Sequence, residues 1–129
     1  MRRATGPSVA TRRLVLERDG GACAWCGRVV AEWGYSLQHR RARGMGGTRR
    51  RDANSPANLV TVCGSATTGC HGWVEAHPAE AERRGFRLRQ WADPADVPVM
   101  YAGGAWFRLD HVGGLVSVSS GFVVSSHAT

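Results

Sequence analysis

The sequence contains no lysine, so all 17 of its basic residues are arginine. Because there are only ten acidic residues, the chain has a formal net charge of +7. A guanidinium group pairs with phosphate through two parallel hydrogen bonds, whereas an ammonium group acts as a point charge. We therefore expect a polyanionic partner, and we favour nucleic acid over an anionic membrane surface.

Long apolar runs are also absent. No stretch approaches the length of a membrane-spanning helix. The basic start, MRRATGPSVATRR, is not followed by the apolar segment of a secretory signal. We expect a cytoplasmic protein with no membrane partner. In that reducing setting, four cysteines are better interpreted as metal ligands than as two disulfides.

The cysteines fall into two pairs. Cys23 and Cys26 have the spacing of a zinc knuckle, and Cys63 and Cys70 enclose six small or flexible residues, GSATTG. Four thiolates complete the tetrahedron that Zn²⁺ prefers and leave no open position. The pattern predicts one closed structural zinc site. A thioredoxin-like redox pair would need a βαβ pattern that is missing here, and His71 in place of one cysteine is the less favoured ligand set.

Hydrophobic periodicity and breaker residues predict an α+β protein. We expect the following elements: a helix over 8–18 with Leu14 and Val15 inward, strands over 35–40 and 58–62, helices over 70–76 and 78–85, a strand over 86–89, and a β-hairpin formed by 97–101 and 106–109. Residues 41–57 lack apolar periodicity and predict a long exposed loop. We place a main domain at 1–92 and a β-hairpin extension with a Ser-rich tail at 93–129.

Four strings follow one another along the chain: CAWCG, LQHRRARGMGG, NSPANLVTVC and CHGWVEAH. In this order and spacing, from about Leu14 to about Arg89, the sequence resembles the HNH endonucleases, in particular the zinc-stapled branch common in bacteriophages and bacteria. The resemblance implies a ββα-metal (His-Me finger) core in residues 1–92, with two strands and a helix around one catalytic divalent ion. That ion would be Mg²⁺ or another divalent ion such as Mn²⁺ or Ni²⁺.

The resemblance also implies roles for single residues. His39 would be the general base that activates water. Asn58 would brace the loop between the strands and help to orient His39. His71 would be a ligand of the catalytic metal. Taken singly, each of these residues is more often structural, and it is their joint order around the cysteine pairs that favours catalysis.

One position departs from the family pattern. The residue before the base is usually Asp or His, and here it is Gln38, whose neutral carbonyl should hold a metal more weakly. Glu75 lies four residues after His71, so the two side chains would share one face of a helix. We therefore expect Gln38, His71 and Glu75 to form the catalytic metal site.

Six arginines lie within twelve residues directly after the proposed base: Arg40, Arg41, Arg43, Arg49, Arg50 and Arg51. Such a cluster would contact DNA mainly through the phosphate backbone, with little sequence preference. Solvated surface charge is the alternative interpretation. We expect Trp25, Trp33 and Trp73 to be core or zinc-flanking residues and not base-stacking ones.

The sequence thus predicts a metal-dependent DNA endonuclease that nicks or cuts duplex DNA. The alternative is a non-catalytic, zinc-dependent DNA-binding module, which could belong to a phage DNA-packaging complex. A phage-encoded chain would act in the cytoplasm of the bacterial host. Zinc deaminases and zinc proteases are disfavoured because the sequence lacks a His-x-Glu before a Cys-x-x-Cys and lacks His-Glu-x-x-His.

Overall fold

The computed structural model describes residues 6–32, 34–42 and 52–119. Its helices and strands, in chain order, are α1 (Val9–Arg18), β1 (Tyr35–His39), β2 (Leu59–Cys63), α2 (Gly69–Ala76), α3 (Pro78–Arg83), β3 (Val99–Met100), β4 (Trp106–Leu109) and β5 (Leu115–Val118). The predicted α+β class is confirmed. No helix within the described ranges is long and apolar enough to cross a membrane.

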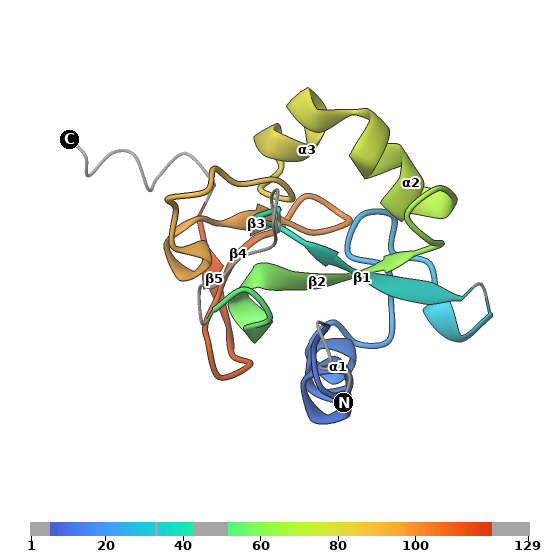
Figure 1. Cartoon of the computed structure of the whole chain (residues 1–129), viewed down its shortest axis with the longest axis horizontal. Coiled ribbons are helices and arrows are strands. Elements are labelled where there is room, and N and C mark those ends of the chain that lie inside the picture. The colour runs from blue at the N-terminus through green and yellow to red at the C-terminus, as the bar shows by residue number, and fades with distance from the viewer. Residues whose placement is uncertain (1–5, 33, 43–51, 120–129) are drawn as a thin grey trace, which may run out of the picture.

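The centre of the fold is an antiparallel hairpin of β1 and β2 that lies between helices. Its register pairs Tyr35 with Cys63 at one end and His39 with Leu59 at the other. Helix α1 lies below the hairpin and α2 lies above it in Figure 1. Because both faces of β2 are covered, all five of its residues are buried. This double coverage explains why the strand reads as a nearly continuous apolar run.

Helix α1 begins after Ser8, whose hydroxyl accepts a hydrogen bond from the Thr11 amide and so caps the first turn. Val15 is fully buried against Leu37 of β1 and Leu59 of β2, as predicted. Leu14 is 38% exposed, so its predicted place in the core is wrong. It packs instead beside the turn between β4 and β5, because only the Val15 side of α1 faces the hairpin.

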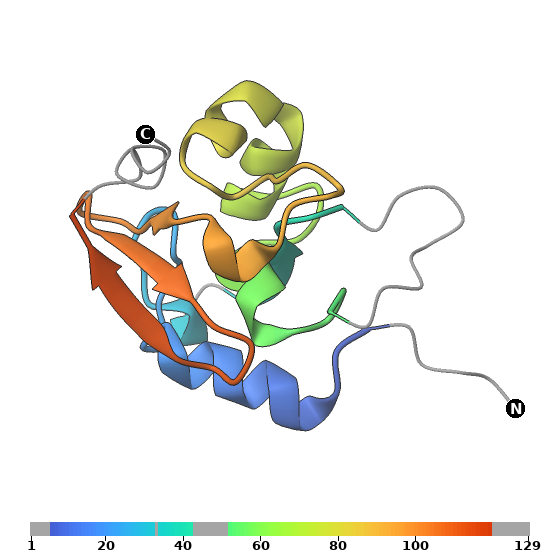
Figure 2. The same cartoon turned by 90° about the vertical axis from the view of Figure 1, so that its left-hand side faces the viewer.

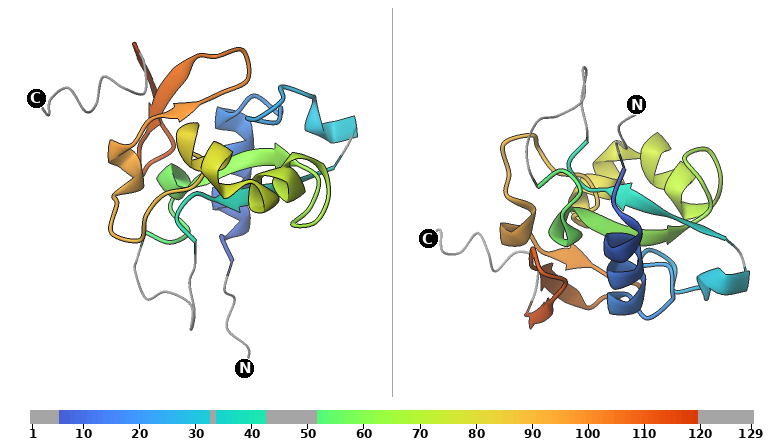
Figure 3. Two further views of the ribbon diagram at one scale, coloured as in Figure 1. Left: turned by 90° about the horizontal axis from the view of Figure 1, so that it is seen from above. Right: turned by 60° about the horizontal axis from the view of Figure 1, so that its bottom comes forward.

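Helices α2 and α3 follow the hairpin and cross over β2, as the view from above in Figure 3 shows. Pro78 opens α3 and Gly85 follows its end, both as predicted. The predicted strand over 86–89 is wrong. Only Leu88 forms a bridge, in parallel with Arg41, while Phe86 turns into the core. The alternating pattern of that segment therefore reflects buried Phe86 and half-buried Leu88 alternating with exposed Arg87 and Arg89, and not a strand.

The C-terminal part forms a second antiparallel sheet in the order β3-β4-β5. The predicted hairpin corresponds to β3 and β4, whereas β5 was not predicted. Figure 2 shows this sheet standing beside the helical part of the molecule, with α1 below it. Val99 and Leu109 of the sheet are buried in the same cluster as Val62 and Phe86. The extension that begins near residue 93 therefore shares its core with the preceding part.

Candidate functional site

The four cysteine sulfurs converge at the end of the hairpin where β1 begins and β2 ends. The Sγ atoms of Cys23, Cys26, Cys63 and Cys70 all lie within 4.8 Å of one another. The Sγ atoms of Cys26 and Cys63 are 4.0 Å apart. A tetrahedron with Zn–S bonds of about 2.3 Å has edges of about 3.8 Å. The predicted clustering of the cysteines is confirmed, and its geometry and chemistry fit one zinc ion.

The wide spacing of the second pair is closed by a tight loop with glycine at both ends. Gly64 has φ of +87°, and a Cβ there would lie 2.2 Å from the Thr68 carbonyl oxygen. Gly69 has φ of +61°, and its Cβ would lie 2.8 Å from the Cys63 carbonyl oxygen. Only glycine fits such conformations and approaches. The loop therefore doubles back and brings Cys70 to Cys63.

Backbone amides support the sulfurs in the same way in both pairs. The Cys26 amide donates to Cys23 Sγ and the Cys70 amide donates to Cys63 Sγ, each at 3.5 Å. Burial raises the pKa of Cys23, and burial together with the nearby Cys23 raises the pKa of Cys70. Burial opposes ionisation of Cys63 as well, but the Cys70 amide and neighbouring thiols outweigh it and lower the pKa of Cys63. Full ionisation of the cluster requires a cation at its centre.

Two tryptophans flank this cluster, as predicted for Trp25 and Trp73. Their rings lie 5.4 Å apart, and both line the surface next to Cys26 and Cys70. Trp25 also meets the ring of buried Phe86 edge to face. The predicted role of Trp33 lies outside the described residues.

His71 follows Cys70 in the first turn of α2, and Ser36 of β1 fixes its imidazole. Ser36 Oγ lies 2.6 Å from His71 Nδ1 and donates its own hydrogen to the Gly64 carbonyl oxygen at 2.7 Å. Because a hydroxyl has only one hydrogen, Oγ must accept from Nδ1–H of His71. The ring is thereby held in one tautomer, with its lone pair on Nε2. That nitrogen lies 3.8 Å from the Glu75 carboxylate.

The surroundings of His71 also favour the neutral ring. Burial lowers the pKa of His71, Glu75 acts in the opposite direction, and electrostatic repulsion by the His39 ring lowers the pKa further. Neutral imidazole is the form that binds metals. Ligand atoms that share a Mg²⁺ ion at about 2.1 Å lie between about 3 and 4 Å apart, so His71 and Glu75 are suitably spaced.

The side-chain oxygen of Gln38 is buried. The side chain is 5% exposed, and its amide nitrogen donates to the His39 carbonyl oxygen at 3.1 Å. Its Oε1 has no hydrogen-bond donor among the described residues. A buried acceptor left in this state costs about 1–3 kcal/mol. A cation would satisfy it, so the residues present fit a divalent ion.

His39 ends β1 and lies three residues beyond Ser36, which corresponds to about 10 Å along a strand. Its Nε2 lies 2.8 Å from Asn54 Oδ1. An amide oxygen can only accept, so Nε2 carries a hydrogen, and in the neutral ring the lone pair is on Nδ1. His39 and His71 line one pocket of about 240 Å³, together with Leu37, Gln38, Arg40, Ala42, Glu75 and Arg87.

Asn58 is fully buried and ties together the two ends of the segment between the strands. Its Oδ1 accepts from the Arg41 amide at 2.8 Å, and its Nδ2 donates to the Ala53 carbonyl oxygen at 2.9 Å. Ala53 directly precedes Asn54, the residue that bonds His39. Asn58 therefore acts on the position of His39 through its neighbours.

The structure corrects the prediction that Arg40 and Arg41 bind DNA. Arg40 is fully buried and donates to four backbone carbonyls at 2.6–2.8 Å, those of Ala57, Gly85, Pro94 and Val97. Burial lowers the pKa of Arg40 to about 9. Arg41 is 3% exposed and pairs with Asp52. Neither guanidinium can reach a phosphate. Arg43, Arg49, Arg50 and Arg51 lie outside the described residues.

Three residues at this site were missed. Ser36 shares a strand face with Gln38, and that periodicity could have pointed to it. Asn54 and Arg87 carry no comparable signal, because they reach the pocket only through the tertiary fold. The described residues also contain a second group of potential ligands, Asp52, Asp93 and His111. Its acids are already engaged, since Asp93 pairs with His111 and Asp52 with Arg41.

The candidate site therefore consists of a four-cysteine cluster at one end of the hairpin and a pocket with two oriented histidines along it. No family model, no curated protein and no solved structure matches this chain.

Proposed function

We propose that the chain is a metal-dependent DNA endonuclease of the HNH type. In this proposal β1, β2 and α2 form a ββα-metal core, and the four cysteines hold a structural zinc ion that secures it. One observation carries the proposal: His39 and His71 line the same pocket, and each ring has a hydrogen-bond partner that fixes its tautomer. Oriented imidazoles facing a shared pocket are what general-base catalysis beside a metal requires.

The residues divide the chemistry between them. His39 Nδ1 takes the proton of a water molecule as its oxygen attacks the phosphorus and the bond to the leaving oxygen breaks. His71 Nε2, the Glu75 carboxylate and Gln38 Oε1 hold a divalent ion, Mg²⁺ or a relative such as Mn²⁺ or Ni²⁺. When bound, that ion polarises the phosphate and stabilises charge on the leaving oxygen. Asn58 and Asn54 keep the His39 ring in place.

The net charge of +7 supports DNA as the substrate. With Arg40 and Arg41 buried, the phosphate contacts pass in this proposal to Arg43, Arg49, Arg50 and Arg51, and to Arg87 at the edge of the pocket. A cytoplasmic location, in a bacterial host for a phage-encoded chain, belongs to the same proposal.

Cleavage of supercoiled plasmid tests this function. The zinc-loaded chain is incubated with Mg²⁺, Mn²⁺ or Ni²⁺, beside a His39→Ala variant and a His111→Ala control. His111 is also a histidine, but it does not line the pocket. We expect nicked or linear plasmid with the wild type and the control, and none with His39→Ala at equal zinc content and DNA affinity. Equal cleavage by all three proteins would exclude His39 as the base.

A second candidate function is a non-catalytic, zinc-dependent DNA-binding module. The neutral Gln38 favours it, because a metal site with only one carboxylate, from the half-exposed Glu75, attracts a divalent ion weakly. No cleavage with any metal, together with DNA binding that weakens steeply with salt, would select this alternative. A role in a phage DNA-packaging complex would then be tested by identifying the proteins that bind this chain.

A further inference from the structure

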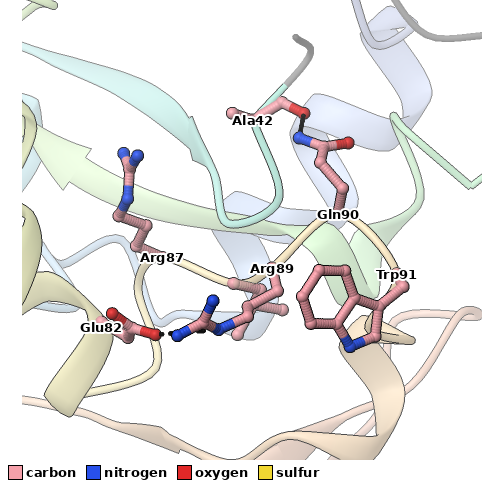
Figure 4. Close-up of a pocket in the computed structure, with 7 residues that line it drawn as sticks. Ala42, Glu82, Arg87, Arg89, Gln90 and Trp91 are labelled. Atoms are coloured by element: carbon pink, nitrogen blue, oxygen red, sulfur yellow. Dashed lines mark hydrogen bonds and ion pairs between the residues drawn. The ribbon is translucent and has the colours of Figure 1, made fainter.

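A second hollow adjoins the pocket that holds the two histidines. It has a volume of about 360 Å³ and is formed mainly by the segment that follows α3; its lining residues are Ala42, Glu82, Arg87, Leu88, Arg89, Gln90 and Trp91 (Figure 4). Ala42 and Arg87 line both hollows. The two hollows therefore adjoin each other at these residues.

The wall of this hollow is fixed to the end of β1, directly beside His39. The Leu88 amide donates to the Arg40 carbonyl oxygen at 2.7 Å. The Gln90 side chain donates to the Ala42 carbonyl oxygen at 2.7 Å, as Figure 4 shows. Arg41 Nη1 donates to the Ala92 carbonyl oxygen at 2.8 Å. Three separate bonds thus hold residues 88–92 to the strand end, and the side chains between them are presented from a rigid support.

Those side chains combine an exposed aromatic ring with positive charge. Trp91 is 75% exposed, so the indole ring is open to solvent. The Arg89 guanidinium lies 5.7 Å from the centroid of the Trp91 ring, and its pairing with Glu82 at 3.5 Å is exposed to solvent. Arg87, at the junction of the two hollows, has no hydrogen bond or ion pair in the described part of the chain.

We infer that this hollow is a subsite for an unpaired nucleotide that flanks the scissile phosphate, with Trp91 stacked on its base and Arg87 bound to the intervening phosphate. The position relative to a scissile phosphate rests on the proposed nuclease function. Indole faces bind bases by stacking, and arginine binds the backbone and strengthens the stack. In an intact duplex the base faces are covered by their neighbours, so the subsite selects single-stranded, gapped or flapped nucleic acid.

Binding measurements separate this subsite from general attraction to DNA. A labelled short single strand and its duplex are each titrated with the full zinc-loaded chain without added divalent ion, and fluorescence anisotropy reports binding. Trp91→Ala should weaken single-strand binding about 10-fold, the size of one base–aromatic stack. It should change duplex binding less than about 2-fold, and Trp91→Phe should keep most of the affinity. Zinc content and thermal unfolding verify that the variants are folded.

Arg87→Ala tests the phosphate contact, with Arg83→Ala as its matched control on the exposed face of α3. Arg83 is 67% exposed and paired with Glu80. Arg87→Ala should reduce the slope of log affinity against log salt for the single strand by about one, whereas Arg83→Ala should leave it unchanged. Equal slopes for both variants would overturn the assignment of Arg87.

The outcomes also distinguish this subsite from the nuclease proposal. Unchanged single-strand binding by Trp91→Ala, or an equal loss on single strand and duplex, overturns the subsite even if plasmid is cleaved. A selective loss on the single strand supports the subsite even if no metal supports cleavage, and the chain is then a binding module for unpaired strands.

Discussion

Nδ1 of His71 donates to Oγ of Ser36 across 2.6 Å, and this bond sets which nitrogen of the imidazole faces Glu75. The bond joins α2 to β1, so the helix and the strand hold the ring together. A helical residue whose second nitrogen is anchored on a strand has little freedom to turn away. Orientation of this kind accounts for much of the affinity of a histidine ligand.

Under the proposed nuclease function, Ser36→Ala should lower the affinity for the divalent ion at His71, or the rate of plasmid cleavage, by about 10- to 100-fold. The structural zinc content should not change, because Ser36 does not contact a cysteine sulfur. Cleavage rates measured over a range of Mn²⁺ concentrations test this, with Ser65→Ala as a control for loss of a hydroxyl in the exposed loop between Cys63 and Cys70. Identical metal dependence of wild type and Ser36→Ala would rule out the orienting role.

The two glycines of that loop predict a sharper effect on zinc. Gly64→Ala should weaken zinc binding and destabilise the fold, because the new Cβ would lie 2.2 Å from the Thr68 carbonyl oxygen. Gly104→Ala is the matched control, since Gly104 has a similar φ of +94° but open space around it. The control should cost only about 1 kcal/mol of unfolding free energy, from backbone strain alone. Competition with a chromogenic chelator gives the zinc affinities, and equal affinities would refute the packing argument.

Arg40→Leu should lower the free energy of unfolding by about 3 kcal/mol or more, because it leaves four buried carbonyl groups without the hydrogen-bond donors that Arg40 provides. Arg83→Leu, on the surface of α3, should stay within about 0.5 kcal/mol of wild type. Urea denaturation of both variants measures the difference. A folded Arg40→Leu protein of wild-type stability but weaker DNA binding would restore the phosphate-contact role that the burial of Arg40 contradicts.

Tyr101→Phe should flatten the dependence of stability on alkaline pH. Burial raises the pKa of Tyr101, the nearby Asp19 raises it further, and the phenol donates to Asp19 at 2.6 Å. The unfolded phenol ionises near pH 10, while the folded one keeps its proton to higher pH. Between those values the unfolded state binds fewer protons, so stability falls by about 1.4 kcal/mol per pH unit as pH rises. The variant lacks this loss, so its stability deficit at pH 7 should shrink above pH 10 in urea titrations.

Sequence alone indicated the four-cysteine cluster and the central hairpin because both depend on local patterns. The two thiol pairs beside glycines predict a metal site without reference to distant residues, and the apolar run before Cys63 predicts a covered strand or a buried helix. These features required no knowledge of distant contacts.

The errors arose where distant segments decide the outcome. Arg40 and Arg41 follow a strand in a polar stretch, and nothing local shows that backbone carbonyls from 57, 85, 94 and 97 will surround one of them. The segment 86–89 alternates as a strand does, yet it meets only the end of β1 and pairs through Leu88 alone. Strand β5 is largely exposed, so it lacks the apolar alternation that would have predicted it.

The two hydrogen bonds that Asn58 makes, one to Arg41 and one to Ala53, have a consequence for how the sequence of this chain can change in evolution. One buried side chain holds both ends of the stretch between Arg41 and Ala53. The length of that stretch can therefore change without moving the strands of the hairpin. Doubling the length of a closed loop costs only about 0.6 kcal/mol. Longer segments can therefore be inserted between residues 42 and 52, by evolution or by design, while the pocket of His39 and His71 and the four-cysteine cluster keep their geometry.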